Sequence, residues 1–301
     1  MKFLKGLALG LLSFFLFLSL SVFGLALTIN QTVLNPDFVA SGVNKLDMSS
    51  LAEEFLSEQI PLDGEQELVA GVLDDTIADL EPWIKEQASA VIYAGYDYLV
   101  GESQSLSLVI STEQLKESLR DNLRSVFYQS IPPELAGASP SEIDAVFNQY
   151  YQEFSEQIPA TIDISEEMIG PEVMTTLEQA REYIGYFQIG YQALIAFIVI
   201  LIAGIILIHR QVRGATRQLG ITFLTYGVPG FASIFILKNY AMEQLVQLMT
   251  QTGFPASLQA WLPQLADDFL SPLEMFSLGI LIGGIALLVA SFVYKPRETS
   301  F

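Results

Sequence analysis

Four long runs of apolar residues interrupt an otherwise polar chain. They are GLALGLLSFFLFLSLSVFGLAL at 6–27, IGYQALIAFIVILIAGIILI at 189–208, LGITFLTYGVPGFASIFIL at 219–237 and MFSLGILIGGIALLVASFVY at 275–294. None of these runs contains a charged residue, and each has about the 20 residues that a helix needs to cross the hydrocarbon of a bilayer. Because a helix satisfies its own backbone hydrogen bonds in lipid, we expect four transmembrane helices.

The polar region between the first two runs has mostly helical spacing. Its apolar residues recur three and four positions apart, as in STEQLKESLRDNLRSVFYQ at 111–129 and SPSEIDAVFNQYYQEFSEQI at 139–158. Asn35 before Pro36 predicts the start of one helix, and Pro82 predicts the start of another.

Two short stretches of this region break the helical period. SLSLVIS at 105–111 and ATIDIS at 160–165 contain alternating or β-branched residues, which is typical of strands. We expect them to form a short two-stranded pairing. After the second stretch, a helix is expected to begin at Pro171 and to continue into the second apolar run.

These patterns predict a mainly α fold class, with four transmembrane helices and a largely helical domain that holds one two-stranded β pairing. The segment 239–272 is amphipathic and broken at GFP (253–255), so it is expected to lie on the membrane surface or to pack as a helical loop. The expected divisions are transmembrane helices at 1–27, 186–209, 219–238 and 273–294, the helical domain at 28–185, a basic loop at 210–218, the amphipathic loop at 239–272 and a tail at 295–301.

Charge is distributed unevenly along the chain. The sequence has 34 acidic and 14 basic side chains, and residues 28–185 hold 29 of the acids but 6 of the bases. This region therefore carries a formal charge of −23, and the remainder of the chain carries +3. Such an acidic domain is a poor partner for nucleic acid or for anionic lipid.

The basic residues beside the apolar runs predict the orientation. LIHRQVRGATRQLG at 207–220 holds Arg210, Arg213 and Arg217 and no acid. Loops rich in Lys and Arg stay in the cytoplasm, so we expect a multi-pass protein of the cytoplasmic (plasma) membrane, with both termini cytoplasmic and 28–185 extracytoplasmic. The arginines are interpreted as a topology signal, and the alternative is a docking patch for a cytoplasmic partner or anionic lipid head groups.

The first apolar run is interpreted as an uncleaved signal anchor. GLA at 24–26 has small residues at both positions of a cleavage-type motif, so a cleaved signal peptide stays open as the alternative. Cleavage would leave three spans and would change no other assignment.

The sequence offers little catalytic chemistry. It contains no cysteine and one histidine, His209, which excludes disulfides and multi-histidine metal sites. Motifs of serine hydrolases, zinc proteases, P-loop proteins and Rossmann proteins are absent. Asp74, Asp75 and Asp79 are interpreted as a solvated acidic face, the alternative being a cation site or the carboxylate pair of a hydrolase. We therefore expect no enzymatic activity, catalytic residue, cofactor or metal site.

Polar features are also sparse in the apolar runs. Lys238 and Glu274 lie at span ends, where they could pair. Gly279 and Gly283 are four residues apart, which favours close packing of helices, including a helix–helix oligomer. The absence of charge inside the runs disfavours an ion pump or channel.

Two resemblances accompany these patterns. The order of spans and loops, with RGAT at 213–216 and LG at 219–220, resembles FtsX- and MacB-type ABC permeases, which implies a subunit that transmits force from a cytoplasmic ATPase. The phrases TVLNPDFV (32–39), YDYLVGESQSLSLVIS (96–111) and RQLGITFLTYG (217–227) are similar to uncharacterised prokaryotic four-span membrane proteins with a helical extracytoplasmic domain. The second resemblance implies no activity and no binding residue.

The sequence therefore predicts a non-enzymatic envelope interaction or assembly protein. It would contact the lipid bilayer through its spans and a protein partner through its extracytoplasmic domain. The alternative is a permease or mechanotransmission subunit that works with a separate cytoplasmic ATPase.

Overall fold

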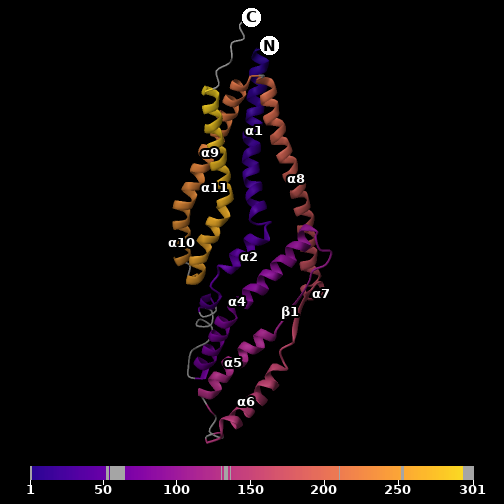
Figure 1. Cartoon of the computed structure of the whole chain (residues 1–301), viewed down its shortest axis with the longest axis vertical. Helices are drawn as coiled ribbons and strands as arrows, with labels where there is room; N and C mark the ends of the chain where they lie inside the picture. Colours follow the sequence, from indigo (N-terminus) through magenta and orange to yellow (C-terminus); the bar gives the residue numbers. More distant parts are fainter. Residues whose placement is uncertain are drawn as a thin grey trace. The chain divides into compact units, whose positions relative to one another are not determined.

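The computed structural model describes residues 2–51, 54, 65–129, 131, 135, 137–209, 211–251 and 254–293, and it is mainly helical (Figure 1). The first half contains α1 (Lys2–Gln31), α2 (Pro36–Asn44), α4 (Glu65–Val100), β1 (Ser107–Ser111), α5 (Glu113–Gln129) and α6 (Pro140–Ser155). The second half contains β2 (Thr161–Ser165), α7 (Glu166–Ile169), α8 (Pro171–His209), α9 (Val212–Ile236), the π-helix η2 (Leu237–Ala241), α10 (Met242–Gln251) and α11 (Ala256–Val293).

Four of the helical segments are long and apolar enough to cross a membrane. They are Phe3–Gln31, Pro171–His209, Val212–Gln251 and Ala256–Val293, and 18-residue stretches within them have mean hydropathies of 2.3, 2.8, 1.6 and 2.4. The predicted fold class, four apolar helices in a mainly α chain, is confirmed. The protein is a multi-pass membrane protein by the length and composition of these helices.

The chain forms two compact units, which we describe separately. The bundle unit comprises Met1–Phe38, Glu182–Gly253 and Leu262–Phe301. The sheet unit comprises Val39–Arg181 and Phe254–Trp261. The helix that was expected to begin at Pro171 is confirmed, since α8 continues from Pro171 to His209 without a break.

The bundle unit packs α1, α8, α9 and α11 around an apolar core. Tyr226 of α9 lies at its centre, with its ring 6.3 Å from that of Phe17 and 5.7 Å from that of Phe276. The other buried core residues are Leu9, Leu16, Leu20, Leu201, Ile205 and Leu219. Large apolar side chains also point outward, among them Leu7, Phe14, Ile200, Ile282 and Phe292. An apolar outer surface of this kind is what contact with a lipid bilayer requires.

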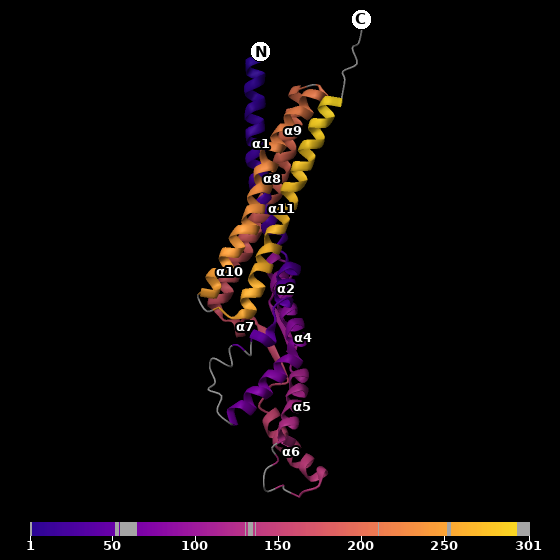
Figure 2. The same cartoon turned by 90° about the vertical axis from the view of Figure 1, so that its left-hand side faces the viewer.

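The sheet unit is built around α4, which packs beside α5 (Figure 2) and beside β1 (Figure 1). β1 and β2 pair antiparallel, with Ser107 opposite Ser165 and Ser111 opposite Thr161. This confirms the predicted two-stranded pairing. The inward face of the sheet carries Leu108, Ile110, Ile162 and Ile164, because alternate side chains of a strand point to the same face.

Of the two predicted helix starts, one is found in the structure and the other is not. The Asn35 side chain accepts a hydrogen bond from the Asp37 backbone N–H at 3.0 Å, so the predicted start of α2 is confirmed. The prediction that Pro82 begins a helix is wrong, because α4 continues through it from Glu65 to Val100. Leu80 and Tyr98 of α4 are 3% and 4% exposed. Burial of side chains on both sides of the proline offsets the backbone hydrogen bond that it removes.

Candidate functional site

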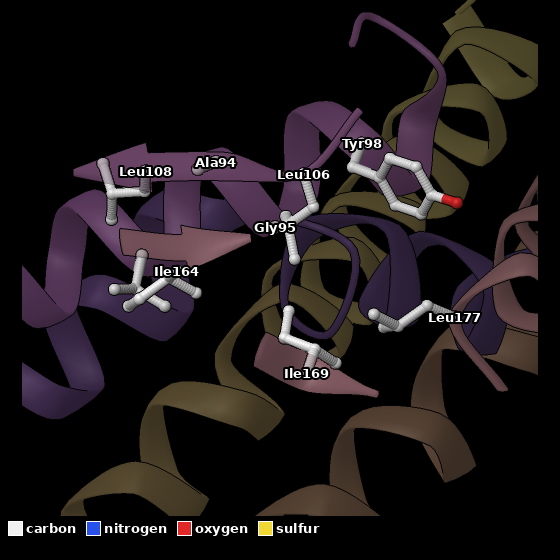
Figure 3. A pocket seen from close by; sticks show the side chains of 9 residues that line it. Ala94, Gly95, Tyr98, Leu106, Leu108, Ile164, Ile169 and Leu177 are labelled. Carbon is white, nitrogen blue, oxygen red and sulfur yellow. The ribbon is translucent and has the colours of Figure 1, made fainter. Parts of the chain in front are cut away.

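An apolar cavity of about 150 Å³ lies in the sheet unit (Figure 3). Its walls come from five elements and one connecting residue, so that segments far apart in the sequence meet there. The lining residues are Val91, Ala94, Gly95 and Tyr98 of α4, Leu106, Leu108 of β1, Ile164 of β2, Ile169 of α7 and Leu177 of α8.

Local structure explains why these side chains converge. The four residues from α4 occupy positions that are three and four apart, so they share one face of the helix. Leu108 and Ile164 are directly opposite each other in the antiparallel register, so both point to the same side of the sheet. Leu177 completes the lining from the first turns of α8.

The cavity is accessible from the surface of the sheet unit. Tyr98 is buried, whereas the other eight lining residues are each half-buried. A Cβ atom added at Gly95 would meet no atom within 4 Å. Glycine inside a helix costs roughly 0.5–1 kcal/mol relative to alanine, and at Gly95 it leaves space that a side chain would otherwise fill.

Charged groups border the apolar lining without entering it. The Arg181 guanidinium lies 5.1 Å from the centre of the Tyr98 ring, which is a cation–π contact. Gly101 has a φ of +85°, and a Cβ there would lie 3.4 Å from Arg181 Nη2. The Glu166 carboxylate accepts a hydrogen bond from the Leu106 backbone N–H at 3.4 Å. One arginine and one carboxylate are therefore held beside the cavity.

The chemistry of this lining suits binding rather than proton transfer. Tyr98 is its one titratable side chain, and acid–base catalysis needs a positioned donor or acceptor with a suitable pKa. Sites for small-molecule ligands span roughly 300–1,000 Å³. An apolar cavity of about 150 Å³ accepts a single group of about the size of benzene. The cavity therefore fits one apolar side chain better than a whole metabolite or an acyl chain.

The structure describes two of the three arginines that were singled out in the basic loop. Arg210 lies outside the described residues, and Arg213 and Arg217 lie on the first two turns of α9, which begins at Val212. A Cβ atom on Gly214 would clash with the ring of His209, the last residue of α8, so glycine permits this tight turn. The role of the three arginines as a topology signal or docking patch stays a prediction.

Close helix packing in the bundle unit involves other glycines than those predicted from the sequence. A Cβ on Gly227 would lie 2.8 Å from the Leu281 backbone, and a Cβ on Gly220 would lie 3.0 Å from the Gly284 carbonyl oxygen. Gly279, in contrast, has no atom within 4 Å of such a Cβ, and the nearest atom to Gly283 is Phe223 Cδ2 at 3.8 Å. The proposal of an oligomer through Gly279 and Gly283 stays a prediction.

A charged cluster lies where α9, η2 and α11 approach one another in the bundle unit. The Lys238 ammonium group is 2.6 Å from the Glu274 carboxylate, which confirms the expected pair. It is also 2.9 Å from Asp267, which the sequence analysis did not include. Asp267 and Glu274 are seven residues apart on one helix, and this spacing was the available signal.

The structure describes the side chains of Asp75 and Asp79 in the acidic cluster on α4. Asp79 accepts a hydrogen bond from Asn122 at 3.1 Å, and the side chain of Asp74 lies outside the described residues. Within the described part of the chain, no group of three or more His, Asp or Glu residues is positioned to hold a metal ion.

Comparisons with protein-family models, with curated proteins and with solved structures find no match to this chain.

Proposed function

We propose that the protein is a non-enzymatic interaction or assembly protein of a cell envelope. In this proposal residues 28–185 lie outside the cytoplasm and bind a protein partner, and the four apolar helices hold the protein in the membrane. The observation that carries the proposal is the charge of this region, 29 acidic against 6 basic side chains.

The few cations of the sheet unit are largely engaged in internal contacts. Arg124 lies 2.6 Å from Asp144 and joins α5 to α6. On the same helix, Arg120 donates a hydrogen bond to Asn148 at 2.7 Å. Lys85 pairs with Glu81 at 2.6 Å. Since these cations are engaged within the unit, the surplus of carboxylates is left for solvent or for a partner. Complementary charge raises association rates and selects partners.

The cavity supports binding over catalysis. It offers an apolar recess next to carboxylate-rich surface, and a combination of an apolar anchor with surrounding polar groups is typical of protein interfaces. We therefore favour a protein partner with a basic surface over a small-molecule substrate.

The experiment is purification from native membranes in a gentle detergent through a C-terminal tag, with mass spectrometry of the bound proteins. We expect a stoichiometric envelope protein that is released as salt is raised, because screening weakens contacts between exposed charges. The matched control is the triple variant Arg210→Gln, Arg213→Gln and Arg217→Gln, which should retain that protein.

The same purification separates the proposal from the permease alternative. Recovery of a cytoplasmic ATPase that is lost in the triple arginine variant would contradict the proposal and favour a force-transmitting subunit. α8 ends at His209 and α9 begins at Val212, so this short connection offers an ATPase few residues beyond the helix ends.

A further inference from the structure

We infer that the apolar cavity of the sheet unit receives one apolar side chain from a basic segment of the protein partner. This inference depends on the proposed function and adds the chemistry of the partner to it. The size of the cavity, its opening and the charge around it support this inference.

Size decides between the apolar occupants. A cavity of about 150 Å³ matches a single benzene-sized group and is below the range of small-molecule sites. A leucine, isoleucine, methionine or phenylalanine side chain fits such a volume, whereas a complete lipid chain does not. Anchoring of one buried side chain in a pocket is a common feature of tight protein interfaces.

The opening of the cavity lets a side chain enter from outside. Gly95 leaves free space around its Cα, and Ile169 and Leu177 on the opposite wall are half-buried. In Figure 3, Gly95 lies between the sheet residues and the pair Ile169 and Leu177. A larger residue at position 95 would therefore occupy the space that the partner's side chain requires.

The carboxylates beside the cavity indicate which residues should flank the apolar side chain of the partner. Glu166 is bonded to the Leu106 backbone beside the cavity, and the neighbouring Glu167 is exposed. Arg181 lies against Tyr98, so it is already engaged with the ring. A segment with Lys or Arg on both sides of its apolar residue would place opposite charges against these carboxylates, within a region of formal charge −23.

The test is site-specific photo-crosslinking of the full chain in native membranes. A photoreactive amino acid replaces Met168, which is 64% exposed and adjacent to the lining residue Ile169. We expect a covalent adduct with a protein, and mass spectrometry should place the crosslink near an apolar residue that has Lys or Arg neighbours.

Two substitutions on α4 make the test specific. Gly95→Leu fills the cavity, and it should reduce the adduct at least about tenfold, since burial of an apolar side chain is worth a tenfold affinity or more. Leucine is also a better helix former than glycine, and the added Cβ meets no atom within 4 Å, so α4 is retained. Ala78→Leu, at an exposed position on the same helix, is the matched control and should leave the adduct unchanged.

The outcomes separate this inference from the proposed function. Four results would each overturn the inference. They are an adduct with lipid, no adduct with protein, an acidic or wholly polar crosslinked segment, and an adduct that Gly95→Leu leaves intact. A second photoreactive position replaces Tyr150 of α6, which is 65% exposed. If Tyr150 crosslinks a protein and Met168 does not, the cavity inference fails and the proposed function stands. If neither position crosslinks a protein, both fail.

Discussion

The approach of α9 to α11 in the bundle unit gives a sharp prediction for Gly227→Ala. The new Cβ would lie 2.8 Å from the Leu281 backbone, whereas ordinary contact begins at 3.4 Å. The two helices would therefore have to separate by about 0.6 Å at this point. No side-chain rotation can relieve the clash, because the opposing atoms are the N and Cα of Leu281.

The size of the effect follows from two opposing contributions. Overpacking of a tight interior costs about 1–3 kcal/mol, and contact with backbone favours the upper end of that range. Replacement of a helical glycine by alanine gains roughly 0.5–1 kcal/mol. The free energy of unfolding should therefore fall by about 2 kcal/mol, which corresponds to a decrease in Tm of about 4–8 °C for a unit of this size.

The matched control is Gly279→Ala in α11, where an added Cβ has no neighbour within 4 Å. Its Tm should stay the same or rise slightly. Thermal unfolding of both purified variants in one detergent, followed by intrinsic fluorescence, measures the difference. Equal Tm values for the two variants would refute the close approach of α9 to α11 at Gly227.

Three further predictions test orientation, pH dependence and the charged cluster. Because the chain has no cysteine, a single Ser141→Cys variant should react with a membrane-impermeant maleimide in intact cells and a Gln211→Cys variant should not; the reverse pattern would invert the proposed orientation. Hydrogen bonding to Lys85 lowers the pKa of Glu81 below its usual 4.5, so this carboxylate stabilises the fold above about pH 4.5 and the stabilisation is lost as the pH falls through the lowered pKa. The Tm difference between wild type and Glu81→Gln should then shrink as the pH falls below 4.5, and a difference that stays constant into acid would contradict the assignment. Lys238→Met leaves the carboxylates of Asp267 and Glu274 without their cation and should lower Tm. Neutralisation of both carboxylates in the same variant should restore most of the loss, and absence of such rescue would argue against the cluster.

The sequence predicted the elements of the sheet unit better than it predicted the cavity between them. The strands were recognisable because β1 is rich in β-branched residues, Val109 and Ile110, and because Ile162 and Ile164 of β2 alternate with polar residues; both are local signals. The prediction at Pro82 was wrong because tertiary burial of α4 overrides the local preference of proline for a helix start.

The cavity required information that spacing along the chain does not contain. Val91 and Tyr98 are on one helical face, which the sequence shows, but the opposite wall is formed by Ile169 and Leu177, which lie more than 70 residues later. Gly95 could not be predicted as a cavity residue either. An isolated glycine weakens the prediction of a helix, and the free space beside it depends on where the other elements pack.

Because the sheet unit is acidic, salt should have opposite effects on its Tm and on its binding of a basic partner. These two effects distinguish a binding surface from a merely solubilising one. Self-repulsion among surplus carboxylates destabilises a compact domain, so salt should raise the Tm of the free protein as the screening length shortens to about 8–10 Å. A basic partner relieves the same repulsion, so its binding stabilises the domain and weakens as salt is added. A surface that only maintains solubility would show the first effect without the second. Salt should therefore stabilise the free protein and dissociate the complex over the same range. In the proposed complex the cavity would supply the salt-insensitive share of the affinity, since burial of an apolar side chain does not depend on screening.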